Sequence, residues 1–440
     1  MVVRGGTVVD ATGERRADLL VVGDRLAAVG PDLEVPSGAR LVEAGGCVVA
    51  PGLVDLHTHL RQPGAEEAET IETGARAAAL GGYCAVVAMP NTDPPVDSAA
   101  VAADVLALGR KAVCRVEVAG AITVGRAGER LAPMGELAAL GVRLFTDDGA
   151  GVQDAGVMRR ALEYARGLES RGLPVVLGQH CETDSLTAGG VMHEGAWSSR
   201  LGVPGAPAES EELMVARDIA LVRLTGGRVH FLHLSTARSL AMVAAAKAEG
   251  LAVTAEVTPH HLTLADEELA GYDPIYKVNP PLRTAADAAG VRRACAAGVV
   301  DAVATDHAPH PPEAKATTLQ DAAPGMLGLE TALAVTLDAL TGATAAPAMA
   351  LGAVLGLLSW GPARIAGLAV DQGGDQGGPL VAGAPANLFV FDPEERWEVD
   401  PARLASRSRN TPWAGRTLRG RVRHTVWRGE PVVVDGEAQR

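Results

Sequence analysis

The chain lacks the features that mark several large classes of protein. Lys and Arg number 39 against 53 Asp and Glu, so the net charge of −14 argues against general binding to nucleic acid or to an anionic membrane surface. The amino-terminal residues have no apolar stretch of signal-peptide length, and the apolar run at 349–370 is broken by Ser359, Pro362 and Arg364. We therefore expect a cytoplasmic protein without a membrane span, in which this run forms one or two buried helices.

Cysteines are few and scattered. No CxxC pair occurs, and all five lie singly in apolar surroundings, which favours reduced core residues: Cys47, Cys84, Cys114, Cys181 and Cys295. Hydrophobic residues, by contrast, make up 48% of the 440 residues and charged residues only 21%, enough apolar side chains for a large core. This composition indicates a globular, enzyme-sized protein with one large domain and a smaller one.

Short apolar runs alternate with longer alanine-rich segments along the middle of the chain. Segments such as 98–112 and 235–250 repeat apolar residues three and four positions apart, as amphipathic helices do. Eight other runs have the length and composition of buried strands: 47–59, 84–91, 114–122, 142–148, 174–182, 228–235, 252–261 and 301–309. This alternation predicts an α/β fold in which a parallel sheet closes into a (β/α)8 TIM-type barrel. An open doubly wound sheet is the alternative, but no GxGxxG turn follows an early strand.

Both ends of the chain differ from this middle part. Residues 1–50 and 375–440 read as short strands and turns, for example GTVVDATG near the start and ANLFVFDP near the end. We expect the two ends to meet and to build one small composite β-rich domain beside a barrel of residues 51–374.

Unusual polar residues stand at the carboxyl end of most predicted strands. Because a parallel barrel collects the carboxyl ends of its strands at one mouth, we expect these residues to meet there and to form a site. They are His57 and His59, Asn91, Asp147 and Asp148, His180, His233, and Asp306.

Two of them, His57 and His59, lie two positions apart on one strand, so their imidazoles point the same way. Two neutral imidazoles are costly to bury without partners, whereas a divalent metal accepts a lone pair from each; a hydrogen-bonded pair of core histidines is the plainer alternative. With His180, His233, Asp306 and one aspartate of FTDDG they make six zinc-type donors, too many for one tetrahedral ion. The count predicts a binuclear hydrolytic centre, in which two ions share a bridging carboxylate and a bridging hydroxide.

The motifs around these residues follow one another over essentially the whole chain: DLHTHLRQPG, AMPNTDPP, FTDDG, HCE, HLST, AEVTPHHL, KVNPPLR and ATDHAPH. In type and order they resemble the amidohydrolase superfamily and, within it, the dihydroorotase family of the bacterial two-metal type. The resemblance implies two divalent metal ions, expected to be Zn²⁺. By this resemblance His57, His59 and Asp306 would bind the first ion, His180 and His233 the second, and Asp148 of FTDDG would lie between the two. Asp147 points to the opposite face and is expected either to support a ligand from behind or to have a structural role.

The resemblance also implies how a substrate is held. Arg61, Asn91 and His310 would bind the α-carboxylate of dihydroorotate, for which the planar fork of Arg61 is suited. His59 would lie against the substrate as well, and Asn279 of KVNPPLR would meet the edge of the pyrimidine ring.

The loop after the eighth strand would cover the substrate through backbone atoms near Pro324 and Gly325. Here the sequence departs from the family pattern, because Pro324 stands where an aromatic residue is expected. Main-chain contacts tolerate such a change of side chain, so these two residues remain expected substrate contacts.

The reaction implied by the resemblance is the reversible cyclisation of N-carbamoyl-L-aspartate to L-dihydroorotate with loss of water, a step of pyrimidine biosynthesis. Two divalent ions would lower the pKa of the water between them, and Asp306 would take its proton and later deliver it to the departing ring nitrogen. Beyond the small-molecule substrate, association stays open between a homo-oligomer and a complex with aspartate transcarbamoylase.

Two other functions are alternatives. A cyclic amidase of the hydantoinase or allantoinase kind would bridge its metals with a carbamylated lysine after the fourth strand, but VRLFTDDG contains no lysine. A catalytically silent, dihydroorotase-like scaffold subunit would have lost metal ligands, and this chain keeps the full set.

Other histidines near the site have plainer interpretations. His230 is out of phase with His233 along its strand and is expected to face the helices as a packed residue. His260 and His261 end the seventh strand and are not expected to bind metal, although one of the two can line the mouth.

Overall fold

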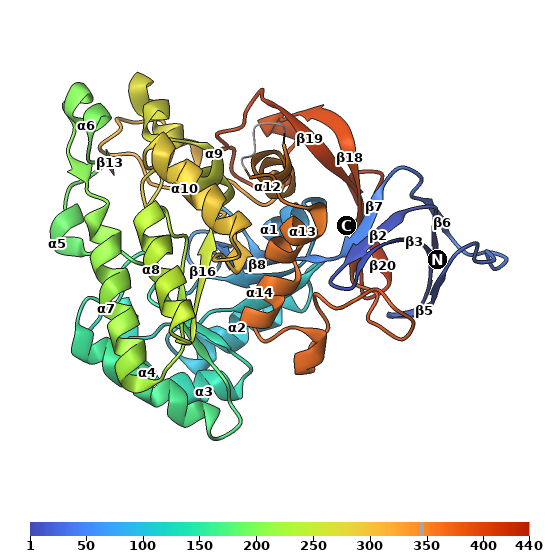
Figure 1. The fold of residues 1–440 in the computed structure, drawn as a ribbon, viewed down its shortest axis with the longest axis horizontal. Coiled ribbons are helices and arrows are strands. Elements are labelled where there is room, and N and C mark those ends of the chain that lie inside the picture. Colours follow the sequence, from blue (N-terminus) through green and yellow to red (C-terminus); the bar gives the residue numbers. More distant parts are fainter. Residues whose placement is uncertain (343–346, 440) are drawn as a thin grey trace.

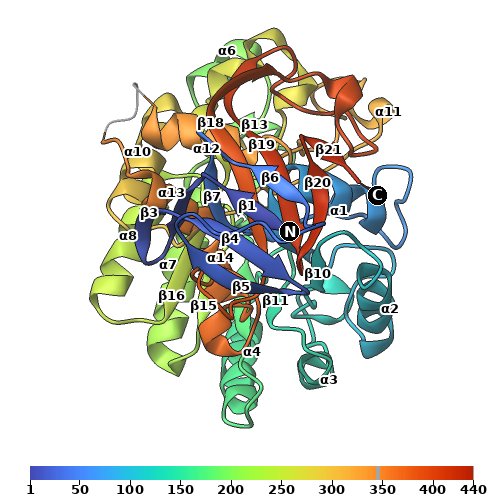
Figure 2. The same cartoon turned by 90° about the vertical axis from the view of Figure 1, so that its right-hand side faces the viewer.

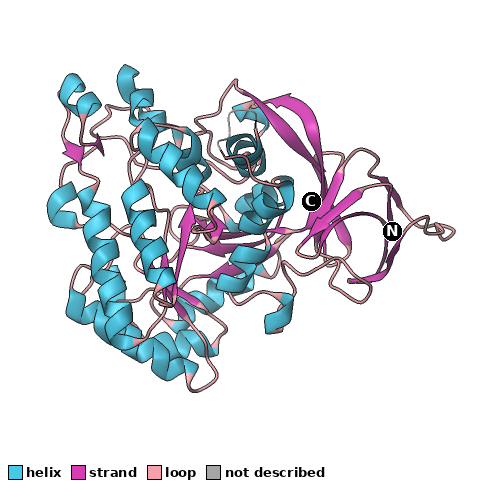
Figure 3. Ribbon diagram, viewed as in Figure 1, coloured by secondary structure: helices cyan, strands magenta, loops and turns pink. Residues whose placement is uncertain are grey.

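The computed structural model describes residues 1–342 and 347–439, which form two parts that lie side by side (Figure 1). One part is a ring of strands enclosed by helices, and the other is built from β-sheets that contain both ends of the chain (Figure 1, Figure 3).

The ring is a parallel β-barrel. Its strands, in the described residues, are β8 (Leu53–Thr58), β9 (Tyr83–Ala88), β10 (Arg115–Val118), β11 (Leu144–Thr146), β12 (Val176–Gln179), β15 (Val229–Phe231), β16 (Val253–Val257) and β17 (Ala302–Val303). They pair in the order β10-β9-β8 and β11-β12-β15-β16-β17. Single bridges join the two sets, Gly120 to Phe145 on one side and Thr58 to His307 on the other. The predicted (β/α)8 barrel is thereby confirmed, and ring closure excludes the open doubly wound sheet.

Helices cover the outside of this ring (Figure 3). Leu240 and Val243 of the helix after β15, for example, pack in the same buried cluster as Val253 and Val257 of the next strand. Thr236 caps that helix by accepting a hydrogen bond from the Ser239 N–H. The covering helices are α1 (Ile71–Leu80), α2 (Ala99–Gly109), α3 (Met134–Ala139), α4 (Ala155–Glu169), α7 (Glu209–Thr225), α8 (Ala237–Ala248), α10 (Ala285–Ala296) and α12 (Ala332–Thr341). Of these, α2 and α8 lie within the two ranges that the sequence predicted to be helical.

The apolar run at 349–370 forms two helices, α13 (Leu351–Leu358) and α14 (Trp360–Ile365), as expected. Ala363 of α14 is fully buried in a cluster with Val54 and Leu144, which lie near the amino ends of their strands. Within the described residues, no helix has the length and apolarity that crossing a membrane requires.

The connections after the barrel strands hold shorter elements. These are α5 (Asp184–Thr187), β13 (Met192–His193), α6 (Ala196–Leu201), β14 (Gly205–Ala206), α9 (Pro259–Thr263) and α11 (Pro312–Lys315). They lie at the end of the ring where the polar residues of the predicted site gather.

The other part of the molecule combines the two ends of the chain (Figure 2). A seven-stranded sheet runs in the order β21-β20-β19-β18-β7-β2-β3, made of β2 (Thr7–Asp10), β3 (Gly13–Arg16), β7 (Val48–Pro51), β18 (Leu388–Glu398), β19 (Thr417–Trp427), β20 (Glu430–Val434) and β21 (Glu437–Ala438). A four-stranded sheet holds β5 (Arg25–Gly30), β4 (Asp18–Val22), β1 (Val2–Arg4) and β6 (Leu41–Glu43). The antiparallel pairing of β7 with β18 joins the ends and supports a composite domain, whose boundaries at residues 50 and 375 stay a prediction.

The segment expected as one strand at 47–59 is instead two strands in two different sheets. Residues Val48–Pro51 pair with β18, and Leu53–Thr58 begin the barrel. Gly52 separates them, and a Cβ atom there would overlap the side chain of Cys84, so the chain passes close to β9 at this point. A continuous apolar run cannot reveal a change of sheet, because the residues are buried on both sides of it.

Candidate metal centre and active site

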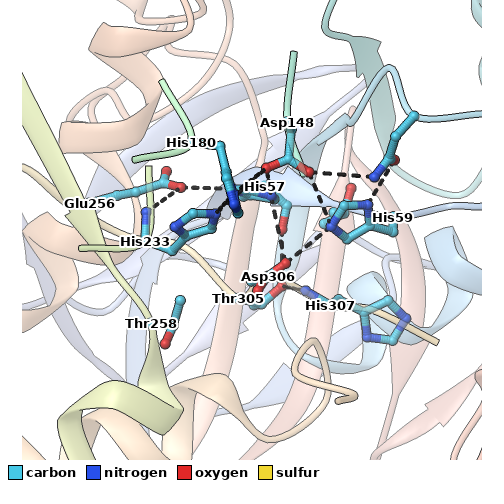
Figure 4. A network of polar contacts seen from close by, with 12 residues as sticks. His57, His59, Asp148, His180, His233, Glu256, Thr258, Thr305, Asp306 and His307 are labelled. Carbon is cyan, nitrogen blue, oxygen red and sulfur yellow. Dashed lines mark hydrogen bonds and ion pairs between the residues drawn. The ribbon is translucent and has the colours of Figure 1, made fainter. Parts of the chain in front are cut away.

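The structure brings the six predicted ligands together at the carboxyl ends of the strands (Figure 4). Asp148 lies at the centre: its Oδ1 is 3.3 Å from His57 Nε2, 3.6 Å from His180 Nδ1 and 3.5 Å from His233 Nε2. His180 Nδ1 and His233 Nε2 are 2.9 Å apart. Four donor atoms from four different strand ends thus face a common point.

The remaining two ligands complete a second group beside the first (Figure 4). Asp306 Oδ1 lies 3.1 Å from His59 Nε2 and 3.6 Å from His57 Nε2, and Asp148 Oδ2 lies 3.7 Å from His59 Nε2. The two oxygens of Asp148 therefore face different donors. Two sets of side chains, His57–Asp148–His233 and His57–His59–Asp306, each have one donor atom per residue within 4.8 Å of the others.

Backbone geometry turns two of these side chains toward the centre. His233 and Asp306 stand two and three residues beyond the ends of β15 and β17, with φ values of 31° and 47°. Positive φ is uncommon outside glycine and occurs where surrounding contacts fix it, often at functional sites.

Two of the converging atoms are buried and lack a hydrogen bond. They are His57 Nε2 and Asp148 Oδ1, which lie 3.3 Å from each other without a hydrogen bond in the described part of the chain. A buried polar atom without a hydrogen bond costs about 1–3 kcal/mol, so such atoms call for a further partner. An imidazole nitrogen and a carboxylate oxygen facing each other are the donor types that bind zinc.

Charge is unevenly distributed in the cluster. Burial alone raises the pKa of Asp148, but the nearby imidazoles of His57, His180 and His233 hold that pKa well below its usual value. Burial likewise lowers the pKa of His180, and Asp148 and Glu182 reverse this and raise it to about 10. The carboxylates of the cluster therefore stay ionised at neutral pH and favour positive charge next to them.

Glu256, a residue that no sequence signal indicated, contacts the His57 ring through Nδ1, on the side away from the cluster. Its Oε1 is 2.9 Å from His57 Nδ1 and its Oε2 is 3.0 Å from His230 Nε2. Burial alone raises the pKa of Glu256, but His230 and His57 lower it to about 2, so the carboxylate is charged. It holds His57 with Nε2 directed at the cluster.

His230 is therefore not packed against the helices, and that prediction is wrong. Its ring lies between Glu256 and Thr254, whose Oγ1 is 2.9 Å from His230 Nδ1. The alternation argument failed because β15 ends at Phe231 and the chain turns before His233, so the phase of one histidine does not give that of the other.

Glu182 has a similar role on the other side. Its Oε2 is 2.8 Å from His180 Nε2, which leaves Nδ1 of that ring facing the cluster. The same oxygen accepts a hydrogen bond from Asn279 Nδ2. The HCE motif contains Glu182, but only the geometry shows that it connects His180 with Asn279.

The predicted substrate residues surround the cluster. Arg61 Nε donates to the Pro309 carbonyl at 3.1 Å, and Arg61 Nη2 is 3.4 Å from His310 Nε2. Asn91 Oδ1 is 2.9 Å from His59 Nδ1. Burial and the Arg61 charge lower the pKa of His310 to about 3, so its ring is neutral beside the guanidinium.

Pro324 contributes its backbone to this region. Its carbonyl oxygen is 2.8 Å from His310 Nε2, and Gly325 follows with a φ of 139°. A Cβ atom at residue 325 would come within 3.0 Å of the ring of His310, so glycine permits the close approach.

Asp147, the other acid of FTDDG, takes no part in the cluster. Its Oδ1 accepts hydrogen bonds from the backbone N–H groups of Ile122, at 2.9 Å, and Thr123, at 3.0 Å. These hydrogen bonds join the end of β11 to the connection after β10, in keeping with the structural role expected for Asp147. Elsewhere in the site, His261 bonds Thr258, whereas His260 Nε2 is buried without a partner in the described chain.

The chain is similar to known proteins both in sequence and in structure. A family model described as "Dihydro-orotase-like" matches residues 46–239. The dihydroorotase of Streptomyces coelicolor is 48% identical over 438 residues, covering 99% of this chain and 98% of its own length. That of Mycobacterium tuberculosis is 48% identical over 434 residues, covering 96% of both. The L-hydantoinase (dihydropyrimidinase) structure from Arthrobacter aurescens has a TM-score of 0.87 at 23% identity, covering 100% of this chain and 97% of that one, which shows a shared fold.

Proposed function

The chain belongs to the dihydroorotase family of the amidohydrolase superfamily, and from this premise we propose that it interconverts L-dihydroorotate and N-carbamoyl-L-aspartate. It is a metal-dependent cyclic amide hydrolase, and the proposed step belongs to de novo pyrimidine biosynthesis. The observation that carries the proposal is the meeting of six imidazole and carboxylate donors with Arg61, Asn91 and His310, a set of groups suited to a carboxylated ring.

The donor set fits two divalent ions, expected to be Zn²⁺. The unpartnered His57 Nε2 and Asp148 Oδ1 support this, as do the different directions of the two Asp148 oxygens. When bound, such ions activate the attacking water and polarise the ring carbonyl. The residues that would hold them are His57, His59 and Asp306 for one ion, His180 and His233 for the other, and Asp148 for both.

Arg61 would bind the carboxylate of the substrate. It is partly buried and contacts a carbonyl oxygen and the neutral ring of His310, with no ion pair in the described part of the chain. A desolvated guanidinium without a carboxylate partner is a strong site for an anion. His310 and Asn91 would hold the other carboxylate oxygen, and His59 would lie against the ring.

Asn279 and the backbone at Pro324 and Gly325 would border the ring of the substrate. The Asn279 amide is already fixed by Glu182, so it presents its carbonyl oxygen in a set orientation. Backbone groups at 324–325 face His310 and can close over the ring without a large side chain.

Asp306 would carry the proton. Burial alone raises its pKa, but His59 and His57 hold that pKa well below its ordinary value, so the carboxylate is ionised and can act as a base. It contacts His59 through Oδ1, which leaves Oδ2 to accept the proton of the attacking water. As the bond between the ring nitrogen N3 and the carbonyl carbon C4 breaks, Asp306 returns that proton to N3. The reverse sequence closes the ring with loss of water.

The test is an assay of the purified protein for N-carbamoyl-L-aspartate formed from L-dihydroorotate, with hydantoin as a competing substrate. We expect turnover of dihydroorotate that chelation removes and Zn²⁺ restores. Hydantoin turnover without dihydroorotate turnover would favour the hydantoinase-like alternative. A metal-replete protein without any turnover would favour the silent scaffold.

Partners and location remain predictions. Self-association and a complex with aspartate transcarbamoylase are both expected to be measurable by size-exclusion chromatography of the protein alone and mixed with a transcarbamoylase. A cytoplasmic location agrees with the substrate proposed.

A further inference from the structure

A segment of the carboxy-terminal part reaches the active site. Residues 399–416 connect β18 with β19, and we call this connection the β18–β19 arm. The arm leaves its own sheet and lies on the barrel: Ser408 Oγ donates to the Ala68 carbonyl at 2.8 Å, and Trp413 is buried in a cluster with Val278. The arm therefore packs against the end of the barrel that holds the proposed substrate site, although both of its ends are in the sheet.

Asn410 of this arm directs all three of its side-chain hydrogen bonds to the loop after β17. Its Nδ2 donates to the carbonyls of Ala308, at 2.9 Å, and Gly325, at 3.2 Å. Its Oδ1 accepts from the His310 N–H at 3.1 Å. Only 4% of Asn410 is exposed, so water does not replace these bonds.

The two limbs of the loop held by Asn410 are the ones that carry predicted substrate contacts. One limb has His310 and the Pro309 carbonyl, which receives Arg61 Nε, and the other has Pro324 and Gly325. The Leu327 N–H also donates to the Asn410 carbonyl at 3.0 Å, which ties the second limb to the arm once more. A single amide thus contacts both limbs, beside the direct hydrogen bond from the Ala308 N–H to the Met326 carbonyl at 2.9 Å, and adds a fixed link nearer to His310.

We propose that Asn410 is a positioning residue for the carboxylate subsite, acting through His310 and the backbone at 324–325. This rests on the proposed function, because it presumes that these groups contact the substrate. The role requires two donors and one acceptor in one plane, which an amide supplies and a carboxylate does not. Aspartate at this position would set an oxygen against the carbonyls of Ala308 and Gly325, and the two limbs would move apart.

The experiment compares Asn410→Asp and Asn410→Ser with Thr411→Val, a matched control. Thr411 is the next residue of the arm and equally buried, but its Oγ1 accepts a hydrogen bond from Trp413 N–H, inside the arm itself. Each variant is measured for kcat and KM with L-dihydroorotate, for bound metal, for melting temperature, and for binding of orotate, a planar analogue with the same carboxylate.

We expect KM and the Kd for orotate to rise at least about tenfold in both Asn410 variants, with kcat within about threefold of wild type and metal content unchanged. Thr411→Val should keep the wild-type KM even if it melts earlier. Asn410 variants with wild-type KM and orotate affinity overturn the proposal, as does an equal rise of KM in Thr411→Val, which would mean that the arm acts only as a fold element.

Asn410→Ser keeps the test decisive if the aspartate variant does not fold, because serine is small and uncharged and cannot span the two limbs. These outcomes differ from the result expected if the proposed function itself is wrong. In that case the wild-type protein itself would neither turn over dihydroorotate nor bind orotate.

Discussion

Replacing Glu256 by Gln keeps the size of the side chain but removes the negative charge between His57 and His230. The carboxylate meets the two imidazoles at 2.9 and 3.0 Å, and one amide oxygen can serve only one of them. If the amide nitrogen turns toward His57 Nδ1, that ring must carry its proton on Nε2. Nε2 is the atom that the metal centre needs, so the substitution competes directly with metal binding.

The size of the effect follows from the pKa of Glu256. A pKa of about 2 against the ordinary 4.5 corresponds to about 3 kcal/mol of favourable interaction with the ionised carboxylate. Shared between two imidazoles, this gives His57 on the order of 1–2 kcal/mol, or roughly a tenfold change in an equilibrium constant. Loss of a carboxylate partner behind a metal-binding histidine generally costs about 10- to 100-fold in affinity, a range that includes this value.

The assay is competition of the apoprotein with a chromophoric chelator for Zn²⁺, with circular dichroism as a check on folding. Glu256→Gln should bind one ion at least about tenfold more weakly than wild type. Thr254→Val is the matched control, because Thr254 contacts His230 on the side away from Glu256. A folded Glu256→Gln variant that binds both ions within about twofold of wild type would refute the reasoning.

Three further predictions concern other parts of the site. Asp306→Asn should lower kcat by about 10²–10⁴-fold with an unchanged circular dichroism spectrum, and near-normal turnover would remove Asp306 from the role of proton carrier. Arg61→Met should raise KM for dihydroorotate by about 10- to 100-fold with a smaller change in kcat, measured by steady-state kinetics, and an unchanged KM would contradict the carboxylate subsite. Burial and the nearby charge of Lys277 lower the pKa of Lys315 to about 7 from 10.5. The unfolded chain therefore binds the ammonium proton of Lys315 more tightly than the folded chain does, and the free energy of unfolding rises with pH between these two values. Lys315→Met should reduce the change in melting temperature between about pH 7 and about pH 9.5, and an unchanged difference would show that Lys315 does not set it.

The barrel and the position of its site could be predicted from the sequence because both depend on local regularities. Helical periodicity located α2 and α8, and the strands of a parallel barrel all end at one mouth. His180 and Asp306 therefore needed no knowledge of three-dimensional contacts to be placed near His57. Polar residues at the ends of apolar runs were a sufficient signal.

The residues behind the site could not be predicted in this way. Alternation gives a side chain's direction only while a strand continues, and β15 stops at Phe231, before His233. Glu256 meets His57 across 199 residues of sequence, Glu182 meets Asn279 across 97, and Asn410 lies about a hundred residues from the loop that it holds. Such contacts arise from packing, which no short motif records.

Anomalous diffraction from crystals grown with Zn²⁺ tests the central claim most directly. The account predicts two peaks separated by the carboxylate of Asp148, one with His57, His59 and Asp306 and the other with His180 and His233, each donor about 2.0–2.2 Å from its ion. Peaks elsewhere in the molecule, or a zinc-loaded crystal in which these six side chains bind no ion, would contradict it.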